Sequence, residues 1–295
     1  MREIGGTRNI SGPFQHAPDS DSECLKPIAE MICPVFDHQW LNDDYKHLVV
    51  EAPVRALAAQ PGQFFHLLCR ESDDVAPYLR RPMSVYRIDR DQGRIEFLYK
   101  VVGEGTRILA ELKPGDGLNA VGPLGRGFDL SSKPEHILLL ARGVGLATLA
   151  PLAEAARERG IGVDAILSAR SSDVLMSVDY LRQSSAIVTT VTDDPDDTHG
   201  DSDVDKVEEM VRHIAKEKGT GLFATCGSNR LLQMLRKVGV ELGISGQVAL
   251  EQQMGCGLGM CYCCVRPFQN TVGEIDYRRV CIDGPVFDLQ ETVSW

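Results

Sequence analysis

Four of the chain's nine cysteines lie within nine positions of one glycine-rich stretch, MGCGLGMCYCCVRPF, at residues 254–268. Cys256, Cys261 and Cys264 follow a C-x4-C-x2-C spacing, and Cys281 comes after sixteen further residues. This is the plant-type spacing for a 2Fe-2S cluster, in which a loop wraps the cluster and a fourth thiolate arrives from a more distant segment. Glycines suit such a loop because its backbone must fold close around sulfide. The spacing therefore predicts an iron-sulfur cluster held by these four thiolates.

Two other chemistries remain open for the same thiols. Zinc sites usually pair two short hooks of the C-x2-4-C or H-x3-5-H type, whereas here three thiols share one loop and the fourth stands alone. A redox-sensing or purely structural thiol group is the second alternative. Cys263 does not fit the cluster spacing. We expect it to be a small buried residue beside the cluster.

Composition limits the classes of partner. The chain has 295 residues, of which 43% are hydrophobic and 25% charged, enough for two globular domains. Its net charge of −11 argues against nucleic acid as a partner, since phosphate binding needs a concentrated positive field. No apolar run is as long as a membrane helix, and the first residues lack the order of a secretory signal. We therefore expect a cytoplasmic protein with no membrane partner, whose reduced thiols can bind metal.

The elements that must position these thiols fall into four regions. Residues 1–32 are polar without periodicity and are expected to be an extension of unknown role. Residues 33–132 contain short β-type runs broken by turn signals such as QPG and KPGDG, which predicts an antiparallel β-barrel. Residues 133–250 alternate strand-like and helical stretches, which predicts an α/β domain with a parallel sheet. Residues 251–295 carry the cysteines and form the expected small 2Fe-2S domain.

Two helices are the clearest signals of the α/β region. Residues 146–160 read LATLAPLAEAARERG, and residues 228–243 read SNRLLQMLRKVGVELG. Ser228 can cap the start of the second helix, and Gly243 can end it in the left-handed conformation. Each helix follows a strand-like run, HILLLA or GLFATC. The residues between strand and helix should therefore lie at the carboxyl edge of the sheet, where α/β domains bind nucleotides.

The barrel region carries residues suited to a flavin dinucleotide. A β-type run begins with RPMS at 81–84, and LYK at 98–100 and GEGT at 103–106 follow. A guanidinium can hold a pyrophosphate, and a hydroxyl can hydrogen-bond a flavin ring or its phosphate. The GT pair precedes the helix-like RILAEL, so its amides could serve an anion at a positive helix end. Taken alone, an Arg-Pro pair at a strand edge is more often structural.

Seven segments of the sequence come in an order that resembles one known family. They are RRPMSVY, VVGEGT, VGPLGRGF, HILLLARGVGLATLAPL, ATCGSNRLLQML, the cysteine loop and CIDGPVF. Over about residues 33–290 they resemble the electron-transfer subunit of the two-subunit, NAD-linked dihydroorotate dehydrogenases, in the ferredoxin-reductase superfamily. The resemblance implies that the barrel binds FAD and that the α/β domain receives NAD. It also implies a hetero-oligomer, in which the cluster passes electrons between FAD and the FMN of a catalytic partner.

The same resemblance assigns the site residues. By similarity, the FAD would be lined by Arg81, Pro82, Met83, Ser84, Leu98, Tyr99, Lys100, Gly105 and Thr106. The iron would be ligated by Cys256, Cys261, Cys264 and Cys281. Cys226, at the end of GLFATC, matches the place where the superfamily sets a cysteine against the nicotinamide and flavin. A small core residue at a strand end is the alternative for Cys226.

The turn after HILLLA is the predicted nicotinamide site. Arg142, Gly143 and Gly145 stand between strand and helix, where backbone amides can meet a pyrophosphate, although many α/β turns carry two glycines for structural reasons. The family usually has three consecutive glycines and an Ala-Pro pair here, whereas this chain has Ala-Arg-Gly and Ala-Thr. The arginine could clamp a phosphate of NAD(H) or NADP(H), or it could narrow the turn and exclude the dinucleotide.

Together these features predict an oxidoreductase component for electron transfer. By resemblance, it links NAD to a partner that oxidises dihydroorotate to orotate in pyrimidine biosynthesis, and the apolar tip GLGMCYC would face that partner. Two other functions stay open: a reductase of the same superfamily serving an oxygenase or another dehydrogenase, and a non-catalytic metal-binding scaffold. The aspartate-rich stretch 193–205 is expected to be a solvated connection rather than a calcium site.

Overall fold

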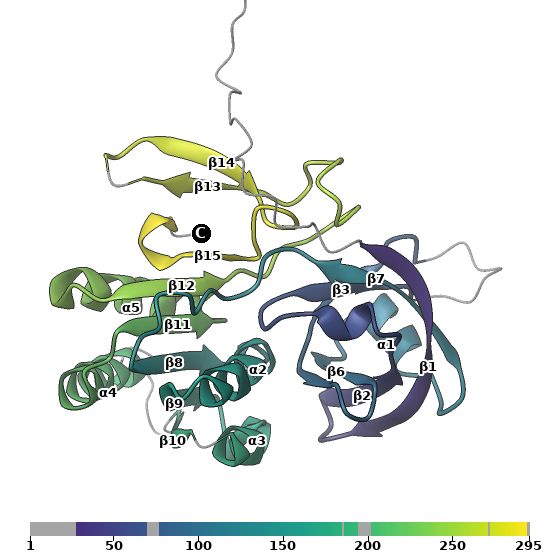
Figure 1. Cartoon of the computed structure of the whole chain (residues 1–295), viewed down its shortest axis with the longest axis horizontal. Coiled ribbons are helices and arrows are strands. Elements are labelled where there is room, and N and C mark those ends of the chain that lie inside the picture. The colour runs from purple at the N-terminus through teal and green to yellow at the C-terminus, as the bar shows by residue number, and fades with distance from the viewer. Residues whose placement is uncertain (1–27, 70–76, 185, 194–201, 271, 294–295) are drawn as a thin grey trace, which may run out of the picture.

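The structure is a computed structural model that describes residues 28–69, 77–184, 186–193, 202–270 and 272–293. Figure 1 shows three parts: a β-barrel at the right, an α/β domain at the left and a β-hairpin above them. Most of the predicted extension and most of the aspartate-rich stretch lie outside the described residues. No helix in the described ranges is long and apolar enough to cross a membrane.

Seven strands form an antiparallel barrel in the first part of the described chain. They are β1 (Ala29–Trp40), β2 (Tyr45–Glu51), β3 (Phe64–Leu67), β4 (Arg81–Ser84), β5 (Arg87–Asp89), β6 (Arg94–Lys100) and β7 (Gly117–Leu124), with the short helices η1 (Ala56–Ala58) and α1 (Glu104–Leu109) between them. Their spatial order is β4-β3-β7-β1-β2-β6-β5. β1 starts earlier than residue 33, since Ala29 already pairs with Gly122 of β7. The predicted antiparallel architecture is confirmed.

The two edge strands, β4 and β5, are joined by only two residues and bring the edges of the sheet together. Val85 N donates to Gln63 O at 3.0 Å, just before β3, and Tyr86 N donates to Glu96 O on β6 at 2.9 Å. Because these bonds reach both ends of the strand order, the sheet closes on itself and few edge groups stay unpaired. Closure fixes β4, which carries the predicted flavin residues, beside β3.

The barrel core follows from the alternation of side chains along its strands. Leu48 on β2 and Leu67 on β3 are fully buried, and the rings of Phe65 and Phe97 meet edge to face with centroids 5.8 Å apart. Successive residues of a strand face opposite sides, so one set fills the interior. The other set is left for the outer surface, where Leu98 packs against the second domain.

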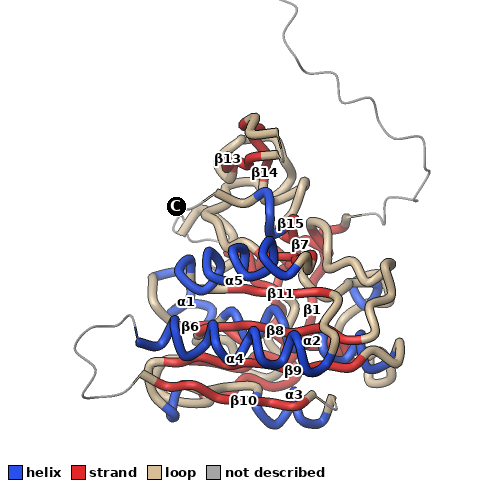
Figure 2. Tube along the Cα trace, turned by 90° about the vertical axis from the view of Figure 1, so that its left-hand side faces the viewer, coloured by secondary structure: helices blue, strands red, loops and turns tan. Residues whose placement is uncertain are grey.

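A parallel sheet with helices on both faces forms the second domain. Its elements are β8 (His136–Arg142), α2 (Gly145–Glu158), β9 (Gly162–Ala169), η2 (Ser172–Val174), α3 (Val178–Gln183), β10 (Ile187–Thr192), α4 (Ser202–Lys218), β11 (Leu222–Cys226), α5 (Asn229–Leu242) and β12 (Ser245–Ala249). The strand order is β10-β9-β8-β11-β12, all parallel. Figures 1 and 2 show α2 and α3 on the face toward the barrel and α4 and α5 on the other. The predicted α/β architecture is confirmed.

Helix α5 illustrates how local sequence sets the ends of an element. Ser228 occupies the N-cap position in an extended conformation, but its side chain makes no capping hydrogen bond, contrary to the expectation. Gly243 ends the helix with φ +67°, in the left-handed region, as predicted. A residue with a Cβ would be strained at that φ, which explains the glycine.

The C-terminal residues join both domains. β13 (Val265–Gln269) and β14 (Ile275–Arg279) form an antiparallel hairpin, and β15 (Val286–Asp288), followed by η3 (Leu289–Glu291), pairs antiparallel with β12. The last strand therefore extends the α/β sheet. On the barrel side, Arg126 N donates to Gly284 O at 2.6 Å. The cysteine loop, between β12 and β13, is held between these two attachments.

Candidate functional site

The four predicted cluster cysteines lie together as two pairs. The Cys256 and Cys261 thiols hydrogen-bond to each other, as do those of Cys264 and Cys281. Cys281 N also donates to Cys264 Sγ at 3.4 Å. In the described part of the chain, no three His, Cys, Asp or Glu side chains converge as they would on a single metal ion. Two pairs of thiolates fit a two-iron cluster, in which each iron takes two cysteines.

The thiols of Cys256 and Cys281 differ in pKa because their surroundings differ. Burial alone would raise the pKa of the Cys256 thiol. Hydrogen bonds from the backbone of Leu258, Cys261 and Met260 and from the Cys261 thiol outweigh burial and lower the pKa to about 7. Burial and the neighbouring Cys264 raise the pKa of Cys281 to about 12. Amide hydrogen bonds to sulfur favour the thiolate and also tune a bound cluster. The donor set and its amides therefore fit a 2Fe-2S cluster.

The structure corrects the expectation for Cys263. This side chain is exposed, and its Sγ donates to Gln253 O at 3.8 Å. The loop turns sharply beside it, because Tyr262 has a positive φ of 57° and Gly259 one of 76°. The turn places Cys263 on the outer side of the loop while Cys264 is buried.

The cysteine loop rests directly on the barrel. A Cβ built on Gly257, whose φ is +68°, would lie 2.8 Å from the His66 ring on β3. A Cβ on Gly125, after β7, would lie 2.5 Å from Gly284 O. Both contacts require glycine, so the loop backbone lies directly against the His66 ring and the backbone at Gly284 lies directly against that at Gly125.

The predicted flavin residues on β4 meet those of α1. A Cβ on Gly105 would lie 2.7 Å from Nε of Arg81, so the guanidinium packs flat against that glycine. The sequence suggested that Gly105 and Thr106 precede the helix. The helix α1 instead begins at Glu104, so both residues lie inside its first turn. Thr106 Oγ1 accepts from Gly103 N at 3.0 Å, and this contact starts the helix early. A guanidinium beside backbone amides is suited to a pyrophosphate.

The LYK segment of β6 divides between two sides of the strand. Leu98 is buried in the cluster that joins the barrel to the α/β domain, and Lys100 pairs with Asp44 at 2.9 Å. Tyr99 points into the barrel interior, where its Oη bonds with His38 Nε2 at 2.8 Å, and burial raises its pKa. Contacts of these residues with FAD stay a prediction.

The glycine turn after β8 packs against the end of β11. A Cβ on Gly145 would lie 2.5 Å from Cys226 O, and a Cβ on Gly227 would lie 2.6 Å from Arg142 O. Gly143 has φ +59°, and a Cβ there would meet nothing within 4 Å. The turn is therefore packed tightly where it faces the end of β11, and it leaves open space at Gly143. This geometry fits close approach of a dinucleotide to backbone amides at the start of α2.

The Arg142 side chain runs along the edge of the sheet and away from the glycine turn. Its Nη1 donates to Ser168 Oγ at the end of β9, and its Nη2 donates to both carboxylate oxygens of Asp193, after β10, at 3.0 and 2.7 Å. The guanidinium thus spans the carboxyl ends of β9 and β10. The sequence left two roles open for Arg142: to clamp a dinucleotide phosphate, or to narrow the glycine turn and exclude the dinucleotide. The position of the side chain does not support the second role.

Cys226 lies beneath this edge with a carboxylate that sequence reasoning missed. Burial raises the pKa of Cys226, the charge of Glu251 raises it further, and a hydrogen bond to Thr148 opposes the shift. Glu251 follows β12, the neighbour of β11. Since parallel strands end at the same edge, a carboxylate closing the run GQVALE could have been recognised as a neighbour of Cys226. A catalytic role for Cys226 stays a prediction.

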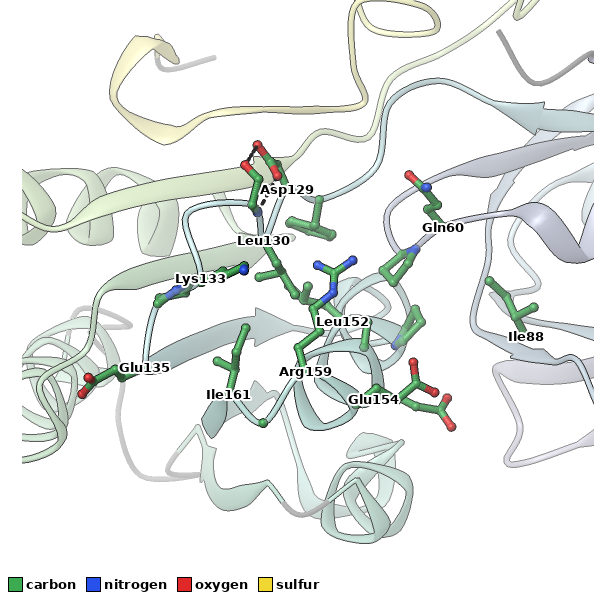
Figure 3. A pocket seen from close by; sticks show the side chains of 18 of the residues that line it. Gln60, Ile88, Asp129, Leu130, Lys133, Glu135, Leu152, Glu154, Arg159 and Ile161 are labelled. Carbon is green, nitrogen blue, oxygen red and sulfur yellow. Dashed lines mark hydrogen bonds between the residues drawn. The ribbon is translucent and has the colours of Figure 1, made fainter. Parts of the chain in front are cut away.

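A separate cavity of about 900 Å³ lies between the barrel and the far end of α2 (Figure 3). Its lining includes Gln60, Phe128 and Arg159, and Figure 3 shows the Arg159 guanidinium turned into it. It is close to Glu135 and Ile161, which precede β8 and β9. The cavity therefore sits at the amino edge of the sheet, opposite the glycine turn, and contains none of the predicted cofactor residues.

Comparison with known proteins matches this geometry. Residues 33–128 match the model of the oxidoreductase FAD-binding domain, and residues 251–293 match that of the iron-sulfur cluster binding domain of dihydroorotate dehydrogenase B. A dihydroorotate dehydrogenase B (NAD(+)) electron transfer subunit from Desulforamulus reducens is 34% identical over 84% of this chain and 92% of its own length. This chain belongs to that family. The corresponding subunit from Fusobacterium nucleatum is also 34% identical, over 86% of this chain and 95% of its own.

Solved structures show the same fold. The NADH-dependent reduced ferredoxin-NADP oxidoreductase, studied for flavin-based electron bifurcation, has 25% identity and a TM-score of 0.71, over 88% of this chain and 89% of its own. The ferredoxin reductase of carbazole 1,9a-dioxygenase, at 21% identity and a TM-score of 0.59 over 74% and 67% of the two chains, is similar in fold. The electron transfer subunit described here is thus an oxidoreductase with an FAD-binding barrel and an iron-sulfur domain.

Family membership decides between the chemistries left open for the thiols. The iron-sulfur match covers the whole cysteine loop and Cys281, so an iron-sulfur cluster, and not zinc, is the group that this subunit carries. As an electron transfer subunit it serves a catalytic subunit. The non-catalytic scaffold is therefore excluded.

Arg81→Ala is expected to weaken FAD retention by the electron transfer subunit. A charge-assisted hydrogen bond to phosphate is worth about 1.5–3 kcal/mol, which corresponds to roughly tenfold to hundredfold in affinity. The flavin-to-protein ratio after gel filtration, and the dissociation constant for added FAD, measure the effect. Arg80→Ala is the matched control, because Arg80 is held by Glu30 at 2.7 Å. Equal FAD retention in both variants would contradict the placement of FAD at Arg81.

Proposed function

We propose that this subunit passes electrons between NAD and an FMN-containing catalytic subunit that oxidises dihydroorotate to orotate. The observation that carries the proposal is the set of four paired thiols resting on a flavin-type barrel. The names of its relatives, dihydroorotate dehydrogenase B (NAD(+)) electron transfer subunit, supply the substrate and the nucleotide. FAD exchanges a hydride with nicotinamide when bound, and a 2Fe-2S cluster moves electrons singly.

Residues of this chain would hold the FAD and the nicotinamide dinucleotide in fixed positions relative to each other. Arg81, lying against Gly105, would bind the FAD pyrophosphate, and the turn at Gly143 and Gly145 would receive that of the nicotinamide dinucleotide. Cys226 and the neighbouring Glu251 lie at the carboxyl ends of β11 and β12, the edge of the sheet that also carries the glycine turn. We propose the division into residues 33–132, 133–250 and 251–295 as the corresponding FAD, nucleotide and cluster modules, with β1 extending the first module back to Ala29.

The cluster loop itself exposes several apolar side chains, and this favours the docking of a partner at the loop. Met260 is 80% exposed, Tyr262 60% and Leu258 45%. Such a group of exposed apolar side chains at a redox site is typical of a protein interface. A catalytic subunit seated here would bring its FMN close to the cysteines.

We propose NAD, and not NADP, as the nucleotide. The carboxylate of Asp193 holds Arg142 at the strand ends where the adenosine ribose of a dinucleotide binds in α/β sheets. An acidic group there accepts from a ribose hydroxyl and repels a 2′-phosphate. We also propose the cytoplasm as the compartment, in keeping with the free thiols of every cysteine in the described residues.

The proposal is tested by reconstitution. The subunit, loaded with FAD and iron-sulfur cluster under anaerobic conditions, is mixed with the FMN-containing dehydrogenase that co-purifies with it from the native host. Dihydroorotate should then reduce NAD with a one-to-one yield of orotate and NADH. NADH-driven dye reduction without any dihydroorotate-dependent NADH formation would instead favour a reductase of the same fold that serves another partner.

A further inference from the structure

His66 occupies the contact between the flavin-binding barrel and the cysteine loop. It lies on β3 and is 1% exposed. A Cβ on Gly257 would lie 2.8 Å from Cε1, 2.9 Å from Nδ1 and 3.1 Å from Nε2 of its ring. The closest atoms are therefore the two nitrogens and the carbon between them. The polar edge of the imidazole faces the loop that carries Cys256 and Cys261.

A polar atom of this ring lacks a hydrogen-bond partner within the described residues. Nε2 of His66 is buried and no acceptor or donor of the described chain reaches it. A buried polar group without a partner destabilises the fold, so such atoms in native proteins usually meet a water, an ion or a ligand. This orphaned atom lies next to the loop built to wrap a cluster.

The surroundings of His66 fix its charge and orientation. Burial, and secondarily the charge of Arg80, lower the pKa of His66 to about 4. The imidazole is therefore neutral at ordinary pH and has one N–H to donate. Phe64 packs on the ring with centroids 5.8 Å apart, and Arg80 Nη1 donates to the His66 carbonyl at 3.3 Å. The Phe64 ring restrains the imidazole, and the bond from Arg80 holds the backbone of β3 at this position.

The same strand connects His66 to the predicted flavin site. In the β3–β4 pairing, His66 stands opposite Pro82, between Arg81 and Met83. A displacement of the His66 ring would therefore displace both β4, on one side, and the cysteine loop, on the other. His66 is placed to tie the position of the cluster to that of the FAD.

We infer that His66 is a positioning residue that joins the barrel to the cluster loop and donates a hydrogen bond from Nε2 to sulfur of the bound cluster. The inference rests on the iron-sulfur cluster of the proposed function. A donor to sulfur stabilises the more negative, reduced cluster and raises its reduction potential. The protein would thus set the potential of the cluster from the flavin domain as well as from the loop.

The test is an EPR-monitored redox titration of His66→Phe, which keeps a ring of similar size but has no N–H. We expect the ratio of reduced to oxidised cluster at a fixed potential to fall about tenfold, a shift of about 59 mV to more negative potential for a one-electron couple. His66→Gln, which retains an N–H donor, should recover part of the shift. His47→Phe is the control, because His47 bonds with Glu96 on the other sheet edge and not with the loop.

A second measurement detects the contact itself by isotope labelling. Protein labelled with 15N-histidine should show a weak nitrogen coupling to the reduced cluster by pulsed EPR, and the coupling should be absent in His66→Phe. A full complement of iron with an unchanged potential and no histidine coupling would overturn the role of His66 alone. A wild-type protein that takes up no iron would instead overturn the cluster on which the inference rests.

Discussion

Replacing Cys281 with serine is expected to remove the iron-sulfur cluster while FAD stays bound. Iron and acid-labile sulfide should fall from about two per chain to near zero, since a two-iron cluster needs all four thiolates. NADH-driven reduction of a two-electron dye should persist, and electron delivery to the catalytic subunit should fall to background. Iron analysis, flavin content and the two activities measure these effects.

The separation of effects follows from where Cys281 lies. It is buried next to Cys264, between β14 and the segment that attaches to the barrel, and its hydrogen bonds are with the Cys264 thiol and the backbone of Gly259. Serine is close in size to cysteine, so the fold around position 281 should be retained. The change removes a ligand without touching the predicted FAD and nucleotide sites.

Cys263→Ser is the matched control for Cys281→Ser. Cys263 lies in the same loop but is exposed, with its Sγ directed to Gln253 O. This variant should keep the full iron content and the full rate of electron delivery. Loss of FAD together with the cluster in Cys281→Ser would show that the two modules are not arranged as described.

The gathering of the four cysteines and the antiparallel barrel could be predicted from the sequence because both follow from local patterns. The cysteine loop is a local pattern in which glycine positions and thiol spacing are constrained by a single bound group. Strand and helix periodicity likewise identified β8, α2 and α5, whose buried faces repeat within one element. Gly243 ends α5 as predicted because its conformation depends only on neighbouring residues.

Features that no local sequence pattern marks could not be predicted. The exposure of Cys263 results from the positive φ of Tyr262, which no composition signal marks. The contact of His66 with Gly257 joins positions that are far apart in the chain. The direction of Arg142 was ambiguous because its partner, Asp193, stands two strands away in the sheet, in a stretch whose composition indicated only a solvated connection.

Asp193→Asn is expected to shift the nucleotide preference of the subunit toward NADPH. In the wild-type chain, the carboxylate of Asp193 accepts both hydrogen bonds from Arg142 Nη2. Asparagine keeps the shape but removes the negative charge, so it no longer repels a 2′-phosphate and holds the guanidinium less tightly. A charge-assisted pair between Arg142 and that phosphate then becomes available. We expect kcat/KM for NADPH relative to NADH to rise roughly tenfold to hundredfold, or about 1.4–2.8 kcal/mol.

Two further variants decide whether Arg142 causes that shift. Asp179→Asn removes the same charge from an exposed position on α3 and should leave the preference unchanged, which controls for the net charge of the domain. Adding Arg142→Ala to Asp193→Asn should abolish most of the gain, because the phosphate then has no guanidinium to meet. An unaltered NADPH-to-NADH ratio in Asp193→Asn, with NADH activity intact, would mean that the dinucleotide does not bind across the ends of β9 and β10. In that case, the arginine that departs from the family's turn serves only to fasten β8, β9 and β10 together at their carboxyl ends.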